Sequence, residues 1–257
     1  MITLLLDTLA ISLIIQAVFF AFAATLKTDK VTDLSYGLTF VALALHLQWY
    51  APFTTLASLT VTGMVVLWGA RLAGYLLYRI IRIKRDVRFD GVREHFWKFL
   101  QFWLFQGLAV WVIMLPVTIW FATPRASGPV MLAGVAIWFA GLVIETVADA
   151  QKFAAKTRPG GGTRWMSTGL WQHSRHPNYF GELLCWWGVF LAVVPDLGAW
   201  AMVAALGPMT ITYLLLYVTG IPTLEKSARE KWGNDPAYQA YVRQTHRLLP
   251  WKPSRAA

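Results

Sequence analysis

The stretch Gly169-Leu-Trp-Gln-His-Ser-Arg-His-Pro-Asn-Tyr-Phe-Gly-Glu182 places dense polar chemistry directly before the apolar run Leu183-Leu-Cys-Trp-Trp-Gly-Val-Phe-Leu-Ala-Val-Val194. Five polar or ionisable residues fall within eight positions of this motif. Such groups are costly at the rim of a hydrocarbon core, so they are usually retained for a task. The alternative is a helix cap with a basic, membrane-facing flank. Five together favour a functional site: Arg175, His176, Asn178, Tyr179 and Glu182.

The composition is that of a membrane protein. Of the 257 residues, 57% are hydrophobic and only 14% are charged, whereas a soluble domain carries about 25% charged residues. Apolar runs recur that are long enough to cross a hydrocarbon core about 30 Å thick. The sequence therefore predicts an all-α polytopic membrane protein with cytoplasmic loops and an amphipathic C-terminal tail. We expect seven transmembrane helices, at 3–25, 31–49, 55–78, 99–122, 129–150, 179–195 and 199–220.

The net charge of +10 is explained by topology better than by nucleic acid. Seven spans with an outside N-terminus place almost all Lys and Arg residues in the cytoplasm, as the positive-inside rule requires. A signal peptide is the less favoured interpretation of the first span, which lacks a basic n-region and is interrupted by Asp7. The lone cysteine, Cys185, excludes an internal disulfide. The basic clusters lie at 27–30, 79–98, 152–175 and 226–255.

A basic stripe marks the third span. Its members recur at helical spacing and therefore share one face. Guanidinium groups bind phosphate through paired hydrogen bonds, and a tyrosine hydroxyl can add another. The alternative, snorkelling to lipid headgroups, fits Arg82 best, whereas Arg71 lies deeper and is expected to face a polar cavity. The stripe consists of Arg71, Tyr75, Arg79 and Arg82.

A second stripe, Glu145, Asp149, Lys152 and Lys156, lies where the fifth span enters the cytoplasm. Its acids can accept hydrogen bonds from ribose hydroxyls or an amide, and Lys156 can pair with phosphate. Salt bridges within the stripe are an equally supported alternative. The glycine run at 160–162 that follows lacks the strand–turn–helix context of a dinucleotide-binding loop.

Asp33 and Tyr36 lie three residues apart near the start of the second span and share a helical face. In an apolar cavity a carboxyl group can stay protonated at neutral pH and donate a hydrogen bond. An N-cap role for Asp33 is equally supported. The five histidines are scattered and have no cysteine partner, so we expect no metal site.

The segment from Gly169 to Trp187, with its His-Pro-Asn-Tyr-Phe-Gly-Glu core, resembles the C-terminal signature of the steroid 5-alpha-reductase family and its bacterial relatives. A weaker resemblance extends from about Lys27 to Pro250. Sterol reductases share the C-terminal half, and isoprenylcysteine and phospholipid methyltransferases share an Arg-His-Pro-x-Tyr element. The resemblance implies one seven-helix membrane domain, 1–257, in which 1–122 surround the substrate and 123–257 hold NADPH.

In the family, a Glu on the second helix and a Tyr on the third hold the substrate carbonyl. Here the nearest acid is Asp33 and the Tyr position is occupied by Trp68, so Tyr36 is the candidate for the missing hydroxyl. His176 and Tyr179 lie in the motif but differ from the animal enzymes. Together, the resemblance, the stripes and the motif predict a cofactor site made of Arg71, Tyr75, Arg79, Glu145, Asp149, Lys156, Arg164, Arg175, His176, Asn178, Tyr179, Glu182 and Trp186.

The predicted activity is NADPH-dependent reduction of the conjugated C=C bond of a lipophilic enone such as a 3-oxo-Δ4-steroid. Asp33 and Tyr36 are the expected catalytic residues, which polarise the carbonyl while hydride reaches the β-carbon. We expect a monomer in the bacterial inner membrane, with the N-terminus outside and the C-terminus and cofactor site cytoplasmic. One alternative is an S-adenosylmethionine-dependent lipid or isoprenylcysteine methyltransferase, which the phosphate-matched basic stripe disfavours. Another is a non-catalytic sterol-binding or transport protein.

Overall fold

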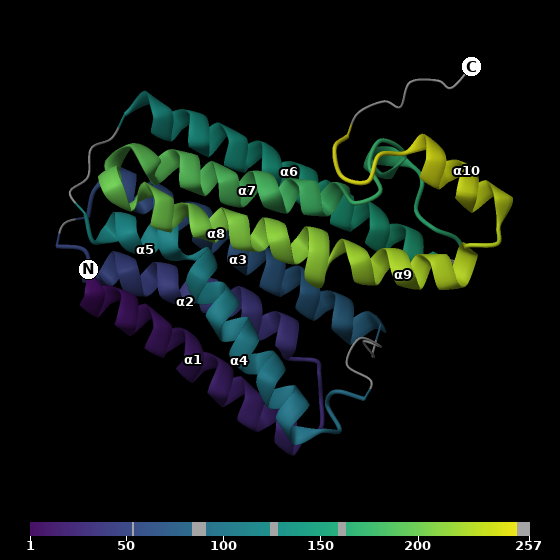
Figure 1. The fold of residues 1–257 in the computed structure, drawn as a ribbon, viewed down its shortest axis with the longest axis horizontal. Helices are drawn as coiled ribbons and strands as arrows, with labels where there is room; N and C mark the ends of the chain where they lie inside the picture. Colours follow the sequence, from purple (N-terminus) through teal and green to yellow (C-terminus); the bar gives the residue numbers. More distant parts are fainter. Residues whose placement is uncertain (53, 84–90, 124–127, 159–162, 251–257) are drawn as a thin grey trace. The chain divides into compact units, whose positions relative to one another are not determined.

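The computed structural model describes residues 1–52, 54–83, 91–123, 128–158 and 163–250, and all regular elements in these ranges are helices (Figure 1). Short turns of 3₁₀-helix lie at Gly169–Gln172, Val194–Asp196 and Gly198–Trp200, and a π-helical turn lies at Leu214–Val218. The α-helices are α1 (Ile2–Thr25), α2 (Thr32–Tyr50), α3 (Leu56–Ile83), α4 (Phe96–Ile113), α5 (Leu115–Phe121), α6 (Pro129–Thr157), α7 (Pro177–Val193), α8 (Ala201–Tyr213), α9 (Ile221–Trp232) and α10 (Pro236–Gln244).

Within the described residues, five helical segments are long and apolar enough to cross a membrane. The protein is therefore an integral membrane protein by the length and composition of its helices. Helices occupy all seven predicted ranges, but α2 and α7 are not among the five segments, so the count of seven spans stays a prediction. Only 17 residues form α7, which begins inside the polar motif. The five segments are Ile2–Thr25, Leu56–Arg82, Phe96–Ile113, Pro129–Thr157 and Gly198–Trp232.

The chain forms two compact units. The first comprises 1–135 and 188–210, and the second comprises 136–187 and 211–257. Three helices, α6, α7 and α8, run from one unit into the other.

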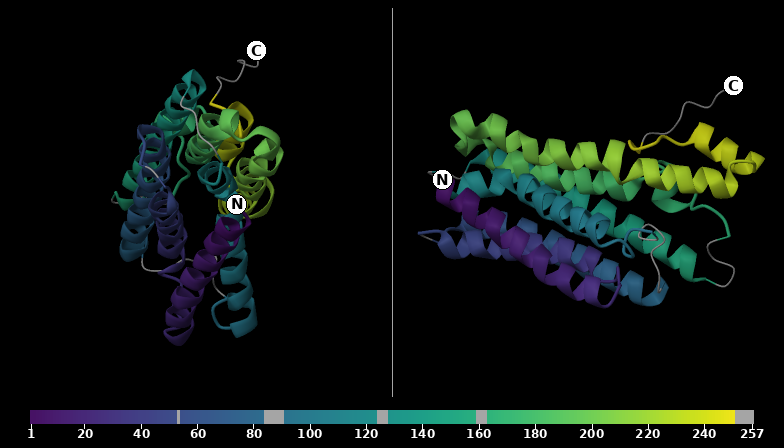
Figure 2. Two further views of the ribbon diagram at one scale, coloured as in Figure 1. Left: turned by 90° about the vertical axis from the view of Figure 1, so that its left-hand side faces the viewer. Right: turned by 60° about the horizontal axis from the view of Figure 1, so that its bottom comes forward.

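In the first unit, α2 and α3 pack along each other (Figure 2), and small residues line their contact. A Cβ atom added at Gly37 would lie 2.8 Å from the carbonyl oxygen of Gly69 and 2.8 Å from Cβ of Ala73. Membrane helices approach closely where small residues line the contact, because apolar burial between helices is not favoured over contact with lipid. Gly37 and Gly69 thus set the spacing of the helix pair that carries Asp33, Tyr36 and the basic stripe.

A buried polar network joins α1, α2 and α4 in the first unit. Nε2 of Gln106 donates to Oε1 of Gln16 at 2.9 Å and to Oγ of Ser35 at 3.0 Å. Nε2 of Gln16 donates to Oγ1 of Thr39 at 2.8 Å. Buried polar groups that satisfy one another favour one arrangement of the helices, because any other arrangement leaves them unpaired. This network fixes α2 against α1 and α4.

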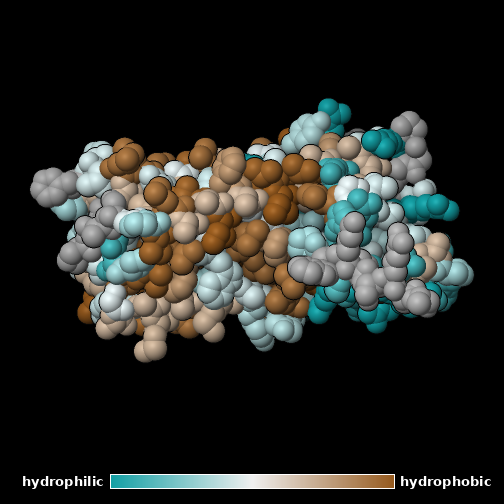
Figure 3. Space-filling model, turned by 90° about the horizontal axis from the view of Figure 1, so that it is seen from above, coloured by the Kyte–Doolittle hydropathy of each residue, from teal (hydrophilic) through white to brown (hydrophobic). Residues whose placement is uncertain are grey.

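In the second unit, α6 and α7 approach closely where Gly181 faces Glu145. A Cβ atom at Gly181 would lie 2.6 Å from the backbone nitrogen of Glu145 and 2.6 Å from the carbonyl oxygen of Gly141. The C-terminal tail forms α9 and α10, and Asp235 caps α10 by accepting from the backbone N–H of Ala237 at 2.8 Å. Hydrophilic side chains gather over this tail on the face shown in Figure 3.

Candidate functional site

The motif is held on the C-terminal half of α6, inside the second unit. Oε1 of Gln151 accepts from the backbone N–H of Leu170 at 3.0 Å, and the indole Nε1 of Trp171 donates to the carbonyl of Ala148 at 3.1 Å. Nζ of Lys152 lies 4.7 Å from the centre of the Trp171 ring, a cation–π contact. These contacts fix where α7 starts relative to the acids of α6.

Asn178 and Asp149 form the polar contact between α7 and α6. Nδ2 of Asn178 donates to Oδ1 of Asp149 at 3.3 Å. Oδ1 of Asn178 is buried and has no hydrogen-bond partner among the described residues. Glu145, Asp149 and Glu182 are also buried, at 2%, 6% and 8% exposure. A buried amide oxygen without a donor among the described residues is a group that an ordered water or a ligand can satisfy.

Glu225 of α9 gathers the cations of the motif and of the tail. Nη2 of Arg175 lies 3.0 Å from Oε1 of Glu225, and Nε2 of His176 lies 3.4 Å from the same oxygen. Nε of Arg247 lies 3.7 Å from Oε2. Burial lowers the pKa of His176 below its ordinary value, and its hydrogen bond with Glu225 partly opposes that shift.

Backbone contacts add to this attachment of the tail. The N–H of Arg175 donates to the carbonyl of His246 at 2.8 Å, and Oγ of Ser174 donates to the carbonyl of Leu248 at 2.7 Å. The hydroxyl of Tyr241 donates to the carbonyl of Trp171 at 2.8 Å. Segments far apart in sequence therefore form one site together with α9.

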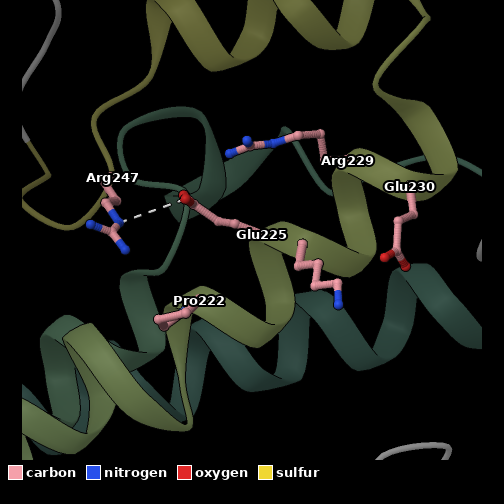
Figure 4. Close-up of a pocket in the computed structure, with 6 residues that line it drawn as sticks. Pro222, Glu225, Arg229, Glu230 and Arg247 are labelled. Carbon is pink, nitrogen blue, oxygen red and sulfur yellow. Dashed lines mark ion pairs between the residues drawn. The ribbon is translucent and has the colours of Figure 1, made fainter.

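A hollow of about 480 Å³ lies beside Glu225 on α9. Figure 4 shows Arg247 next to the Glu225 carboxylate and Arg229 extending back toward it, while Glu230 points away. The lining holds three cationic and two acidic side chains and is open to solvent. The lining residues are Pro222, Glu225, Lys226, Arg229, Glu230 and Arg247.

The remaining candidates of the second unit differ in their surroundings. The Tyr179 ring stacks on His176, with centroids 5.8 Å apart and planes 12° apart. Trp186 is buried, at 1% exposure. Lys156 and Arg164 are exposed. The glycine run at 160–162 lies outside the described residues.

The first unit holds the predicted substrate pair and the basic stripe. Nη2 of Arg79 donates to Oδ2 of Asp33 at 2.9 Å, in an ion pair whose side chains are 28% and 25% exposed. This contact corrects the expectation of a donor in an apolar cavity, because the Asp33 carboxyl accepts from a guanidinium and is partly exposed. The N-cap position of α2 belongs to Val31, so Asp33 is not the cap either.

Tyr36 is partly buried and lies three positions after Asp33 in the sequence. Its ring packs edge-on against Phe40, with centroids 5.1 Å apart, and Phe40 packs in the same way against Trp68. On α3, Arg71 and Tyr75 are half-buried. Arg82 is exposed, and its Cζ lies 5.3 Å from the centre of the Tyr78 ring.

Comparison with known proteins places the chain in a family. The profile of DUF1295, described as a protein of unknown function, matches residues 19–245. The chain belongs to the DUF1295 family. This family is related to steroid 5-alpha-reductase-like membrane proteins. An uncharacterized protein of Schizosaccharomyces pombe, C594.04c, is 25% identical over 278 aligned positions, which cover 94% of this chain and 78% of that protein. No solved structure matches.

Two parts of this DUF1295 protein were not predicted from its sequence. Glu225 lies in the predicted amphipathic tail, where no motif or stripe distinguishes it from the other charges. Gln151 and Trp171, which hold the motif on α6, gave no signal as a pair because they are far apart in sequence. Among the described residues no group of three or more His, Cys, Asp or Glu could hold a metal ion.

Proposed function

We propose that the protein is an NADPH-dependent oxidoreductase of the membrane that saturates the conjugated C=C bond of a lipophilic enone, such as a 3-oxo-Δ4-steroid. The observation that carries the proposal is Asn178. Its Nδ2 is used by Asp149, while its Oδ1 is buried without a donor among the described residues. A ligand with N–H or O–H donors would satisfy that oxygen, which favours a carboxamide-bearing and ribose-bearing cofactor.

The donor set of the second unit fits NADPH. Asp149 and Glu182 can accept from ribose hydroxyls, and the cations of the motif and its flanks can pair with phosphate oxygens. When bound, NADPH supplies the hydride that the reduction needs. The site residues assigned to the cofactor in this unit are Glu145, Asp149, Lys156, Arg164, Arg175, His176, Asn178, Tyr179, Glu182 and Trp186. The family resemblance also implies a cofactor role for Arg71 and Tyr75, and that role stays a prediction from the sequence.

The substrate carbonyl is assigned to Tyr36. Its hydroxyl donates to the carbonyl oxygen and stabilises the negative charge that builds there. Asp33 then acts through Arg79: the carboxylate holds the guanidinium in place rather than donating a proton. The proton that reaches the α-carbon comes from water. This division of roles differs from the pair of donors expected from the sequence.

Ligand-induced stabilisation of the purified protein tests the cofactor. In detergent, NADPH at 100 times its dissociation constant should stabilise the folded protein by about 2.7 kcal/mol. S-adenosylmethionine should leave the melting temperature unchanged. Stabilisation by S-adenosylmethionine alone would overturn the proposal in favour of methyl transfer. Lipophilic-ligand binding with neither cofactor would favour a non-catalytic binding protein.

A further inference from the structure

The contact between His176 and Glu225 constrains where the histidine carries its proton. His176 is 6% exposed, and its Nε2 lies 3.4 Å from Oε1 of Glu225. A carboxylate can only accept a hydrogen bond, so the nitrogen that faces it must be the one that bears hydrogen. In the neutral ring, Nδ1 is then left with a lone pair. Nδ1 is buried and has no hydrogen-bond partner among the described residues.

Glu225 is itself held from several directions. Arg175 shares Oε1 with His176, and Arg247 approaches Oε2 from the tail. Arg247 also donates from Nη2 to the carbonyl of Leu216, in the π-helical turn before α9, at 3.3 Å. Stacking on Tyr179 restrains the other face of the histidine ring. The orientation of His176 is therefore set by neighbours from the motif, α9 and the tail.

We infer that Glu225 is a positioning residue, which fixes His176 as the Nε2–H tautomer and so presents Nδ1 as a hydrogen-bond acceptor to the bound cofactor. This inference rests on the proposed function for the identity of the cofactor. Glu225 itself touches no cofactor in this account. Its effect reaches the ligand through the imidazole, in the way that a carboxylate behind a metal-ligating histidine fixes the tautomer and orientation of that ring.

The charges around His176 give the inference a pH dependence with a definite sign. Those that act on the ring are Glu225 on α9, Lys152 on α6 and Arg175 beside it in the chain. Protonation of Nδ1 removes the acceptor, so cofactor binding should weaken as pH falls through the pKa of His176. Glu225 raises that pKa. Replacing its charge should therefore move the acid limb of binding to lower pH.

Nitrogen NMR of protein labelled with ¹⁵N-histidine tests the tautomer without any ligand. The His176 resonances, assigned by their loss in His176→Gln, should show a protonated Nε2 and a bare Nδ1 at neutral pH. In Glu225→Gln the preference should weaken, since an amide can donate as well as accept. The matched control is Glu230→Gln, on the same helix, exposed and lining the same hollow. A ring that already carries its proton on Nδ1 in the wild type would overturn the inference.

NADPH titration across pH tests the consequence. His176→Gln keeps an amide that can reach Glu225 but lacks the Nδ1 acceptor, and it should bind NADPH about tenfold more weakly. His176→Asn, with a polar atom near the Nδ1 position, should bind more tightly than His176→Gln. In Glu225→Gln the acid limb should move to lower pH, whereas Glu230→Gln should keep it. The cofactor's own phosphate, with a pKa of about 6, titrates equally in all variants, so its effect on binding cancels when the variants are compared.

The outcomes separate this inference from the proposed function. Wild-type affinity in His176→Gln, or an unmoved acid limb in Glu225→Gln, would show that Nδ1 contributes nothing to binding and would overturn the inference alone. A wild-type protein that does not bind NADPH would overturn the proposed function and the assigned ligand. The tautomer spectrum of the free protein would still decide the role of Glu225.

Discussion

The side-chain amide of Asn178 on α7 donates to the carboxylate of Asp149 on α6 over 3.3 Å, and its own oxygen is left buried without a donor. One end of the amide thus joins the two helices, and the proposed function assigns the other end to a ligand.

Asn178→Ala should weaken NADPH binding by about 10- to 100-fold, the usual effect of losing a buried hydrogen bond. Fluorescence titration can measure this, since Trp186 is on the same helix. Asn234→Ala is the matched control, because Asn234 is exposed between α9 and α10. Equal affinity of the Asn178 and Asn234 variants would remove Asn178 from the site.

Tyr36→Phe should lower kcat by about 10²- to 10³-fold, as removal of one oxyanion-stabilising donor does. The ring contact with Phe40 would remain, so the fold and the NADPH affinity should change little. Steady-state NADPH oxidation with an enone is the measurement, and Tyr50→Phe, at an exposed position, is the control. A fully active Tyr36→Phe enzyme would contradict the assignment of the carbonyl to this hydroxyl.

Asp33 and Arg79 should behave as a coupled pair. Because the ion pair is partly exposed, its coupling in a double-mutant cycle should be modest, at most about 1 kcal/mol in stability. Asp33→Ala and Arg79→Ala should each reduce turnover, and the double variant should lose little more than either. Arg82→Ala, on the same helix but exposed, should retain turnover. Additive losses from the two single variants would argue against a shared role.

Gln106→Leu should destabilise the protein by about 1–3 kcal/mol, because Gln16 and Ser35 would lose their donor in a buried setting. Thermal unfolding in detergent, followed by near-UV circular dichroism, would detect the change. Gln101→Leu is the control on the same helix, since Gln101 is exposed. If the two variants melt together, the network does not stabilise α1, α2 and α4.

Gly181→Ala should disrupt the second unit, since its new Cβ would lie 2.6 Å from backbone atoms of α6 that cannot move aside independently. Loss of folded yield and of NADPH binding are expected together. A Cβ atom added at Gly74 on α3 would have no neighbour within 4 Å, so Gly74→Ala should leave folded yield and NADPH binding unchanged. Normal yield and binding in Gly181→Ala would contradict the close contact between α6 and α7.

The sequence predicted the helical membrane fold well because hydrophobic length and composition are local properties. Helix ends were harder to predict: the predicted span 99–122 is divided at Met114, and Pro116 lies in the first turn of α5. The sixth predicted span was placed at 179–195, whereas α7 starts at Pro177, inside the motif. The polar network around Gln106 was missed, because neutral polar residues scattered over three helices give no periodic signal.

The site shows the same limit. Asn178, Asp149 and Glu182 could be chosen from the sequence because each lies on a stripe or in the motif. The partner of Asp33 could not be chosen from the sequence, because Arg79 is 46 positions away. The spacing of Arg79 within its own helix predicted a phosphate contact instead. Glu225 was not predicted as a site residue for the same reason. Its contacts with Arg175, His176 and Arg247 are formed only in the tertiary structure.

The central claim is most directly tested by following the label from deuterated NADPH. Purified protein in lipid nanodiscs would be incubated with a 3-oxo-Δ4-steroid and NADPH carrying deuterium at the transferable position of the nicotinamide, and the product would be analysed by mass spectrometry. The account predicts a saturated ketone that carries one deuterium at the β-carbon, with Asn178→Ala losing the product and Asn234→Ala retaining it. The account would be contradicted if steroid and polyprenoid enones were recovered unchanged and without deuterium. Methylation of lipid when S-adenosylmethionine is supplied would then favour a methyltransferase.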